Sequence, residues 1–549
     1  MPNMLTLKTL HSLEKVFPLT EPQGTESAKT VLSGETAHFQ LAVYNPADNF
    51  QHVFGYTLKI ESDFGDKLRV REVLCMPADN LPPQVDDYSY GVDKGMYPEL
   101  LRPVDTGYLI FALQKWQSLW FTVDTDNVAP GKHEIRLTIF DKEGQNVGEA
   151  QYALTVIPEK IADSDFYFTT WMHYDAIEAK HNVELFGDAF YEVFAGYLDA
   201  FLRSGNTLLY TPLFTPPLDT YVGGERRTAQ LIGVRFEDGA YTFDFTKLDR
   251  FLDFAEAHGI RYFEMSHLFT QWGGKACPKI IASTPEGEKR IFGWETSSLC
   301  PEYAAFLTAL LPQLCRFLTE KGLAKRVFFH LTDEPHEDHL ETYTKLYHLV
   351  KGLIGDFPTL DALSNYSFYE RGVVDIPVPS IKAYEREFRS RKPENVFVYY
   401  CGANNAYYTG RMFDMPLQRT RVLGFGLYEA GVDGFLHWGF NFYNTFFSLR
   451  ELDPYFETAG GRGFYSGDSF IVYPTKGGCL MSNRAEALGE AMYDYRALKT
   501  LEKYIGREKV LDFLHKEGVL DFYTYPRSAK AHIAIREKIN AMIAAHCGK

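Results

Sequence analysis

The sequence predicts an α/β protein in three parts. An N-terminal antiparallel β-sandwich is expected over residues 1–160, a (β/α)8 TIM barrel over residues 161–470, and a C-terminal helical extension that packs on the barrel over residues 471–549. Three observations predict this class. Apolar and polar residues alternate with a period of two in the first part, strand-like and helix-like segments alternate in the second, and apolar residues recur at helical spacing in the third.

The N-terminal part shows the pattern of strands with one buried face. Ala37, Phe39, Leu41 and Val43 alternate with more polar neighbours. Residues 135–139 and 152–156 repeat this alternation on either side of a turn at residues 143–146, which predicts a hairpin. Several such runs, separated by Pro and Gly clusters, indicate an antiparallel sandwich.

The central part alternates strands and helices about eight times. Strands are expected at 166–171, 207–210, 260–267, 327–331, 360–366, 396–401 and 434–438, and helices at 185–202, 248–258, 303–318, 340–354 and 417–430. Residues 369–393 show no clear period, so the sixth strand has no assigned position. This alternation predicts a parallel sheet, and eight repeats favour its closure into a barrel.

The C-terminal part has a helical period. Asn483 followed by Glu486 resembles a capping box, and Leu488, Ala491, Met492, Tyr495 and Leu498 then recur at helical spacing. We expect helices from about residue 484 onwards.

Charge and cysteine content exclude several classes of partner. The formal net charge is −16 and no run of Lys or Arg forms a basic stripe, which argues against a nucleic-acid partner. No stretch approaches the ~20 apolar residues of a membrane span. The seven cysteines show no C-x-x-C spacing, and residues 1–18 lack a signal-peptide pattern, so we expect a cytoplasmic protein with reduced thiols. The oligomeric state stays open.

The acid pair Asp333-Glu334 is the main catalytic candidate. It directly follows the apolar strand 327–331, and carboxyl ends of barrel strands carry catalytic groups. Adjacent acids usually lie on solvated surfaces, but the preceding strand favours a pocket. Two carboxylates in one pocket repel, which raises the proton affinity of at least one, as glycoside chemistry requires. Pro335 is expected to hold Glu334 in an extended conformation.

Other strand ends carry side chains suited to a sugar site. For Trp272 and for the segment 434–444 the alternative is burial in the core, and His267 could instead bond a backbone carbonyl. The candidate substrate-binding residues are His267, Gln271, Trp272, His330, Asn365, Tyr366, Tyr400, Trp438, Asn441 and Tyr443.

No metal or cofactor is predicted. His330, His336, Asp338 and His339 fit no zinc spacing. The glycine-rich stretch 424–431 lacks the G-x-G-x-x-G spacing and falls in a predicted helix, so a dinucleotide site is rejected.

The predicted seventh strand ends without a carboxylate, in Tyr399-Tyr400-Cys401. A retaining glycosidase with two distant acids would need one there. An adjacent pair suffices if the substrate's own 2-acetamido group attacks the anomeric carbon and forms an oxazolinium. One acid then protonates the leaving oxygen and its neighbour holds the acetamido N–H, a substrate-assisted exception to the two-carboxylate rule.

Three segments together resemble glycoside hydrolase family 123 and the related proteins grouped by the domain DUF4091. They are Ser266–Gly273, His330–Pro335 and the tail from Tyr473 through Ser482-Asn-Arg484 to Tyr495. The resemblance covers nearly the whole chain. It implies an exo-acting, retaining β-N-acetylgalactosaminidase that uses neighbouring-group participation on a carbohydrate with a terminal β-linked N-acetylhexosamine. It also implies that Asp333 stabilises the acetamido group and that Glu334 is the general acid/base.

Two alternatives remain at this point. One is a carbohydrate-binding barrel protein without turnover. The other is a conventional two-carboxylate glycosidase with a second acid such as Asp175 or Glu264.

Overall fold

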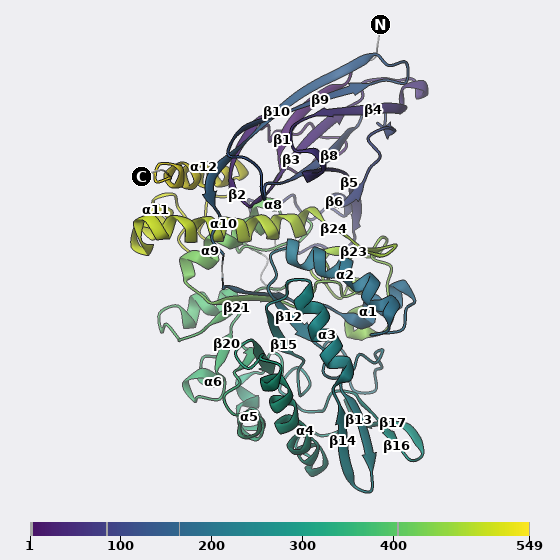
Figure 1. Ribbon diagram of the computed structural model, residues 1–549, viewed down its shortest axis with the longest axis vertical. Coiled ribbons are helices and arrows are strands. Elements are labelled where there is room, and N and C mark those ends of the chain that lie inside the picture. Colours follow the sequence, from purple (N-terminus) through teal and green to yellow (C-terminus); the bar gives the residue numbers. More distant parts are fainter. Residues whose placement is uncertain (1–3, 84–85, 164, 403–405, 548–549) are drawn as a thin grey trace. The chain divides into compact units, whose positions relative to one another are not determined.

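The chain forms two compact units (Figure 1). The computed structural model describes residues 4–83, 86–163, 165–402 and 406–547. Unit 1 comprises Met1–Asp165, Asn405–Ala430 and Leu480–Lys549, and unit 2 comprises Phe166–Asn404 and Gly431–Cys479. The domain boundaries at residues 160 and 470 stay a prediction.

Unit 1 contains two five-stranded sheets, ordered β1-β3-β8-β5-β6 and β2-β10-β9-β4-β7. The strands are β1 (Thr6–His11), β2 (Ala28–Ser33), β3 (Thr36–Tyr44), β4 (Phe54–Glu61), β5 (Leu68–Ala78), β6 (Gly95–Pro103), β7 (Leu109–Ile110), β8 (Trp116–Asp124), β9 (Gly131–Phe140) and β10 (Asn146–Lys160). The predicted hairpin is confirmed, with Tyr152 opposite Ile135. The sheets share one apolar core, in which Phe39 of β3 stacks on Tyr152 of β10. The prediction of wholly antiparallel sheets is wrong in one place, because β2 and β10 run parallel.

The helices of unit 1 are α8 (Leu417–Arg421), α9 (Leu423–Ala430), α10 (Asn483–Ile505), α11 (Arg507–Lys516) and α12 (Ala529–Ala544). The C-terminal helices are confirmed, but the predicted cap is wrong by one residue. Ser482 is the N-cap, and its Oγ accepts a hydrogen bond from Ala485 N at 3.1 Å. Glu486 instead forms a buried ion pair with Arg71 at 2.6 Å.

Unit 2 contains eight parallel strands in chain order. They are β11 (Tyr167–Thr170), β12 (Leu208–Thr211), β15 (Tyr262–Met265), β18 (Val327–His330), β19 (Thr359–Ala362), β20 (Ile376–Val378), β21 (Phe397–Tyr399) and β22 (Gly434–His437). Its helices are α1 (Tyr174–His181), α2 (Asp188–Arg203), α3 (Thr246–Ala257), α4 (Pro301–Glu320), α5 (Leu340–Ile354), α6 (Ser367–Glu370) and α7 (Ile381–Ala383). The unassigned sixth strand is β20.

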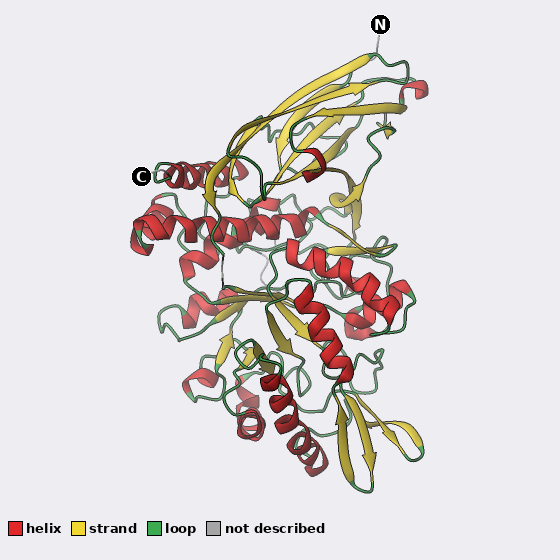
Figure 2. Ribbon diagram, in the orientation of Figure 1, coloured by secondary structure: helices red, strands yellow, loops and turns green. Residues whose placement is uncertain are grey.

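The parallel strands form two ladders, β11-β22-β21 and β12-β15-β18-β19-β20. Figure 2 draws the strands of the protein in yellow and its helices in red. Single backbone hydrogen bonds occur at the two breaks, from Thr207 N to Phe168 O at 2.8 Å and from Tyr399 N to Pro379 O at 3.0 Å. Side chains from all eight strands pack into one core. Within the described residues the ladders do not join into one ring, so the closed barrel is not confirmed.

A four-stranded sheet in unit 2 was missed by the sequence prediction. It is ordered β14-β13-β16-β17, from β13 (Gly233–Glu237), β14 (Ala240–Asp244), β16 (Ile280–Thr284) and β17 (Gly287–Phe292). These strands are mostly exposed, so they lack the apolar run that marks a strand in sequence. In the part of the chain that the structure describes, no helix is both long and apolar enough to traverse a bilayer.

The glycine stretch that resembled a nucleotide loop serves helix packing in unit 1. A Cβ on Gly424 of α9 would lie 1.9 Å from the carbonyl oxygen of Ala491 on α10. Glycine is therefore required for the close approach of the two helices.

We predict that Gly424→Ala lowers the free energy of unfolding by about 1–3 kcal/mol or more, because the added methyl group overpacks this contact. The matched control is Gly352→Ala in α5, where a Cβ meets nothing within 4 Å. That change should be neutral or stabilising by up to ~1 kcal/mol, since alanine favours helices. Chemical denaturation of both variants measures the difference, and equal stabilities would contradict the packing argument.

Candidate active site

The backbone on both sides holds the acid pair beyond the end of β18. Trp272 N donates to Asp333 O at 2.7 Å, and the backbones of Gln271 and Asp333 form an isolated parallel β-bridge. Glu334 N donates to Ala362 O, at the end of β19, at 2.8 Å. The loops after three neighbouring strands therefore fix the position of the pair.

The backbone of Glu334 is in the left-handed region, with φ of 46°. The prediction that Pro335 would keep it extended is wrong. A non-glycine residue in this region costs of order 1–3 kcal/mol and persists only where its surroundings impose it. Here the hydrogen bond from Glu334 N to Ala362 O, and that from Trp272 N to Asp333 O, impose the left-handed conformation.

The pair keeps a proton at unusually high pH. Burial raises the pKa of Asp333 well above its usual value, and repulsion from Glu334 raises it further, while His330 acts in the opposite direction. One carboxyl of the pair therefore remains protonated where an ordinary aspartate would be ionised.

Tyr399 binds the second acid. Its hydroxyl, at the end of β21, donates to Glu334 Oε1 at 2.6 Å. Tyr399 is only 8% exposed, so its hydroxyl reaches Glu334 from the protein interior. Tyr399 was not among the predicted site residues, because a nucleophilic carboxylate was the group expected at this strand end.

A buried charge bridge, formed by His330 with Glu264 and Asp361, lies next to the pair. His330 of β18 contacts Glu264 of β15 through Nε2 and Asp361 of β19 through Nδ1, the latter at 3.1 Å. All three side chains are fully buried. Burial disfavours the imidazolium, but the two carboxylates outweigh it and raise the pKa of His330 to about 9. No three acidic, His or Cys side chains among the described residues form a metal-binding group.

Four predicted substrate residues, Gln271, Trp272, His267 and His330, lie next to the pair. Gln271 and Trp272 clamp Asp333, and the Trp272 indole is 41% exposed. His267 stacks on His330 with ring centroids 4.2 Å apart. Both ring nitrogens of His330 are taken by carboxylates, so its geometry indicates support of the pair rather than contact with substrate.

Other predicted residues make contacts elsewhere in unit 2. Asn441 bonds the backbone of His173 through both amide atoms, and Tyr443 donates to Val472 O at 2.9 Å. Tyr400 is buried against His437, and Trp438 packs on Phe464. The half-buried Asn365 precedes Tyr366, whose ring lies under the guanidinium of Arg391. Their binding roles stay predictions.

Strained loops surround the pair, and they reveal a residue that the sequence did not mark. Left-handed φ values occur at Asp219, Trp272, Glu334, Phe447 and Ser448. The Phe447 ring meets Trp272 edge-on at 6.0 Å, and Ser448 Oγ donates to Asp219 O at 2.9 Å. Burial raises the pKa of Asp219 to about 7, although nearby Arg226 opposes this. Asp219 is thus a half-buried acid beside the site, and no motif in its Pro-rich loop identifies it.

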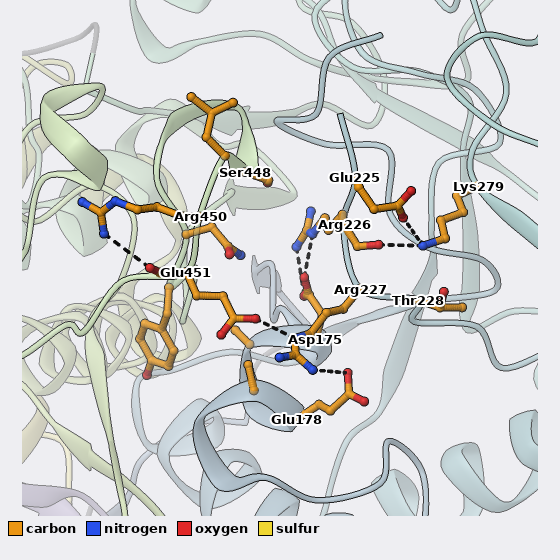
Figure 3. A pocket seen from close by; sticks show the side chains of 15 residues that line it. Asp175, Glu178, Glu225, Arg226, Arg227, Thr228, Lys279, Ser448, Arg450 and Glu451 are labelled. Carbon is orange, nitrogen blue, oxygen red and sulfur yellow. Dashed lines mark hydrogen bonds and ion pairs between the residues drawn. The ribbon is translucent and has the colours of Figure 1, made fainter. Parts of the chain in front are cut away.

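The acid Asp175, considered as a second carboxylate, lies in a different place. It forms a two-pronged ion pair with Arg226, at 2.7 and 3.0 Å, in the wall of a cavity of about 780 Å³ (Figure 3). The described residues that line this cavity do not include Asp333 or Glu334.

Comparison with protein families identifies the chain. The model of the glycoside hydrolase 123 catalytic domain matches residues 171–501. The chain belongs to glycoside hydrolase family 123. A solved family 123 glycoside hydrolase from Clostridium perfringens, 14% identical, has the same fold with a TM-score of 0.72, and the match covers 99% of each chain.

Two further solved structures are much less similar. A glycosyl hydrolase family 2 member from Bacteroides cellulosilyticus is 12% identical, with a TM-score of 0.28 over 79% of this chain and 46% of its own. An endo-β-1,4-mannanase from Thermotoga petrophila is 13% identical, with a TM-score of 0.35 over 61% and 77%. No curated protein matches the chain. Membership of family 123 makes this chain a glycosidase, as the acid pair predicted.

The charge of His330 predicts a pH dependence of stability in this glycosidase. Its folded-state pKa of about 9 lies above the ordinary value of 6.5. Its contribution is therefore complete below pH 6.5 and is lost as the pH rises through 9, by up to about 3 kcal/mol. His330→Gln should flatten this window in denaturation curves between pH 6 and 9.5, and should cost about 3–5 kcal/mol at pH 6. The exposed His348→Gln is the control, and an unchanged pH dependence in His330→Gln would refute the charge.

The hydrogen bond from Tyr399 to Glu334 predicts that removing the hydroxyl lowers activity. Removing one hydrogen bond to a charged group costs about 1.5–3 kcal/mol, so Tyr399→Phe should lower kcat/KM roughly tenfold to hundredfold. Tyr347→Phe is the matched control, because its hydroxyl bonds Asp375 at 3.2 Å elsewhere in unit 2. Wild-type kinetics in Tyr399→Phe would show that this contact does not serve the reaction.

Proposed function

We propose that this family 123 enzyme is an exo-acting, retaining β-N-acetylgalactosaminidase that uses substrate-assisted catalysis. Asp333 orients the 2-acetamido group and Glu334 is the general acid/base. The observation that carries the proposal is the adjacent pair itself. Burial and repulsion from Glu334 raise the pKa of Asp333, and a tyrosine stands where a distant nucleophile would be.

The conventional alternative lacks an available second acid among its two candidates. Glu264 is fully buried and bonded to Trp171 and His330. Asp175 is buried in its ion pair with Arg226. Neither could attack an anomeric carbon next to Glu334 without breaking a buried ion pair, which costs about 3–5 kcal/mol.

The first step uses both acids at once. The acetamido carbonyl oxygen attacks the anomeric carbon, the bond to the leaving-group oxygen breaks, and Glu334 gives its proton to that oxygen. Ionised Asp333 accepts a hydrogen bond from the acetamido N–H and balances the positive charge of the oxazolinium. Tyr399 holds Glu334 in position for the transfer.

The second step reverses the role of Glu334. Its carboxylate takes a proton from water as the water oxygen attacks the anomeric carbon and the oxazolinium ring opens. Two inversions at this carbon give net retention. In the empty site, the raised pKa of Asp333 favours a proton on that residue. An arriving acetamido N–H stabilises ionised Asp333 and thereby moves the proton to Glu334, where the first step needs it.

The substrate class follows from the family and the pair. The solved relative from Clostridium perfringens was analysed for glycolipid glycan hydrolysis. We therefore propose a glycan of this class, with a terminal β-linked N-acetylgalactosamine, as the substrate. A location in the cytoplasm is part of the same proposal.

The acid variants test the roles directly. Glu334→Gln should lower turnover of an aryl N-acetyl-β-galactosaminide about 10²–10⁴-fold, the usual contribution of general acid catalysis. Asp333→Asn should also lose most activity, because the acetamido group is no longer held and its charge no longer balanced. Glu337→Gln, an exposed acid in the same loop, is the control and should keep full activity.

A thiazoline analogue of the oxazolinium should inhibit the wild-type enzyme. Activity on the matching sugar without a 2-acetamido group, combined with insensitivity to the thiazoline, would overturn the substrate-assisted mechanism.

A further inference from the structure

The cavity beside Asp175 is formed by helix α1, two loops of unit 2 and Lys279, which directly precedes β16 (Figure 3). One face of α1 forms one wall, the segment 225–228 after β12 forms another, and the loop 443–451 after β22 closes the third side. Its volume of about 780 Å³ is within the range of small-molecule sites.

The described lining is polar and balanced in charge. It carries four cationic and four acidic side chains, namely Arg226, Arg227, Lys279 and Arg450 with Asp175, Glu178, Glu225 and Glu451. Every one of these cations has an acidic partner: Arg226 pairs with Asp175, Arg227 with Glu451, Lys279 with Glu225 and Arg450 with Glu457.

This balance selects the chemistry of the ligand. A phosphate or carboxylate ligand would be repelled by the carboxylate that accompanies each cation. An apolar ligand would desolvate charged groups and return no hydrogen bonds to them. An uncharged polyol fits, because its hydroxyls accept from the guanidinium groups and donate to the spare lone pairs of the carboxylates.

The cavity shares a loop with the acid-pair site. Ser448 and Glu451 line the cavity, while Phe447 of the same loop packs edge-on against Trp272, which bonds Asp333. At the other wall, the Arg226 guanidinium contacts His173 Nδ1 at 2.9 Å, and His173 Nε2 lies 2.9 Å from Trp438 O, at the end of β22.

We propose that this cavity is a subsite for an uncharged sugar unit on the leaving-group side of the scissile bond. This inference rests on the proposed exo-action: if the terminal sugar occupies the acid-pair site, every further sugar belongs to the leaving group. The Arg227–Glu451 pair, with its side chains 50% and 41% exposed, joins two walls of the cavity and presents hydrogen-bonding edges to such a sugar.

The test compares two substrates on the full-length enzyme. One is an aryl N-acetyl-β-galactosaminide, which has no second sugar, and the other is a trisaccharide with the same terminal residue. In Arg227→Ala and in Glu451→Ala, the ratio of kcat/KM for the trisaccharide to kcat/KM for the aryl glycoside should fall about tenfold, mainly through KM, as expected for one lost charge-assisted hydrogen bond.

Arg235→Ala is the matched control, since it removes an exposed ion pair with Glu237 on the β13–β14 hairpin. Its ratio should equal that of the wild type. A wild-type ratio in both cavity variants would overturn the subsite, as would an equal loss on both substrates.

Failure of the proposed function has a different signature, namely a wild-type enzyme that does not cleave the aryl glycoside. In that case, calorimetric titration with the disaccharide leaving group decides the matter. Binding to the wild type that is lost in Arg227→Ala supports the sugar site, and no binding to the wild type refutes it.

Discussion

His330 carries a positive charge in the interior of unit 2, between Glu264 on β15 and Asp361 on β19. The three side chains come from adjacent parallel strands and are all fully buried. Such a bridge is weak support for stability in itself, since desolvation offsets much of the attraction. Removing one member would leave an uncompensated buried charge, however. The bridge therefore ties together the three strands whose following loops hold the acid pair.

The bridge also sets the electrostatics of the reaction. Asp333 lies near one imidazolium and near three carboxyl groups, those of Glu334, Asp361 and Glu264. The carboxyl groups and burial together outweigh the imidazolium, so Asp333 holds its proton more tightly than usual. In the proposed mechanism, an N–H brought by the substrate stabilises ionised Asp333, and the adjacent Glu334 receives the proton. The proposed proton transfer between Asp333 and Glu334 requires that the two acids be adjacent.

Strain marks the same region of the glycosidase. Glu334, Trp272, Phe447 and Asp219 all have left-handed backbones, on loops that contact one another. Such residues persist only where tertiary contacts over-determine them, and they cluster at sites where function requires the geometry. The loop that carries Phe447 continues into the polar cavity. One loop thus belongs both to the candidate active site and to the proposed sugar subsite.

The sequence alone determined the order of the elements and the main acids. Apolar periodicity located seven of the parallel strands. The apolar run that ends directly before Asp333 and Glu334 singled out this pair. Both signals are local in the sequence. The sheet β14-β13-β16-β17 was not predicted, because its strands bury little apolar surface. Only the tertiary structure decided the conformation of Glu334, the partner role of Tyr399, the burial of His330, Asn441 and Tyr443, and the position of Asp219. Each depends on contacts between strand ends far apart in the chain, and no local pattern encodes the neighbour that a side chain meets across a parallel sheet.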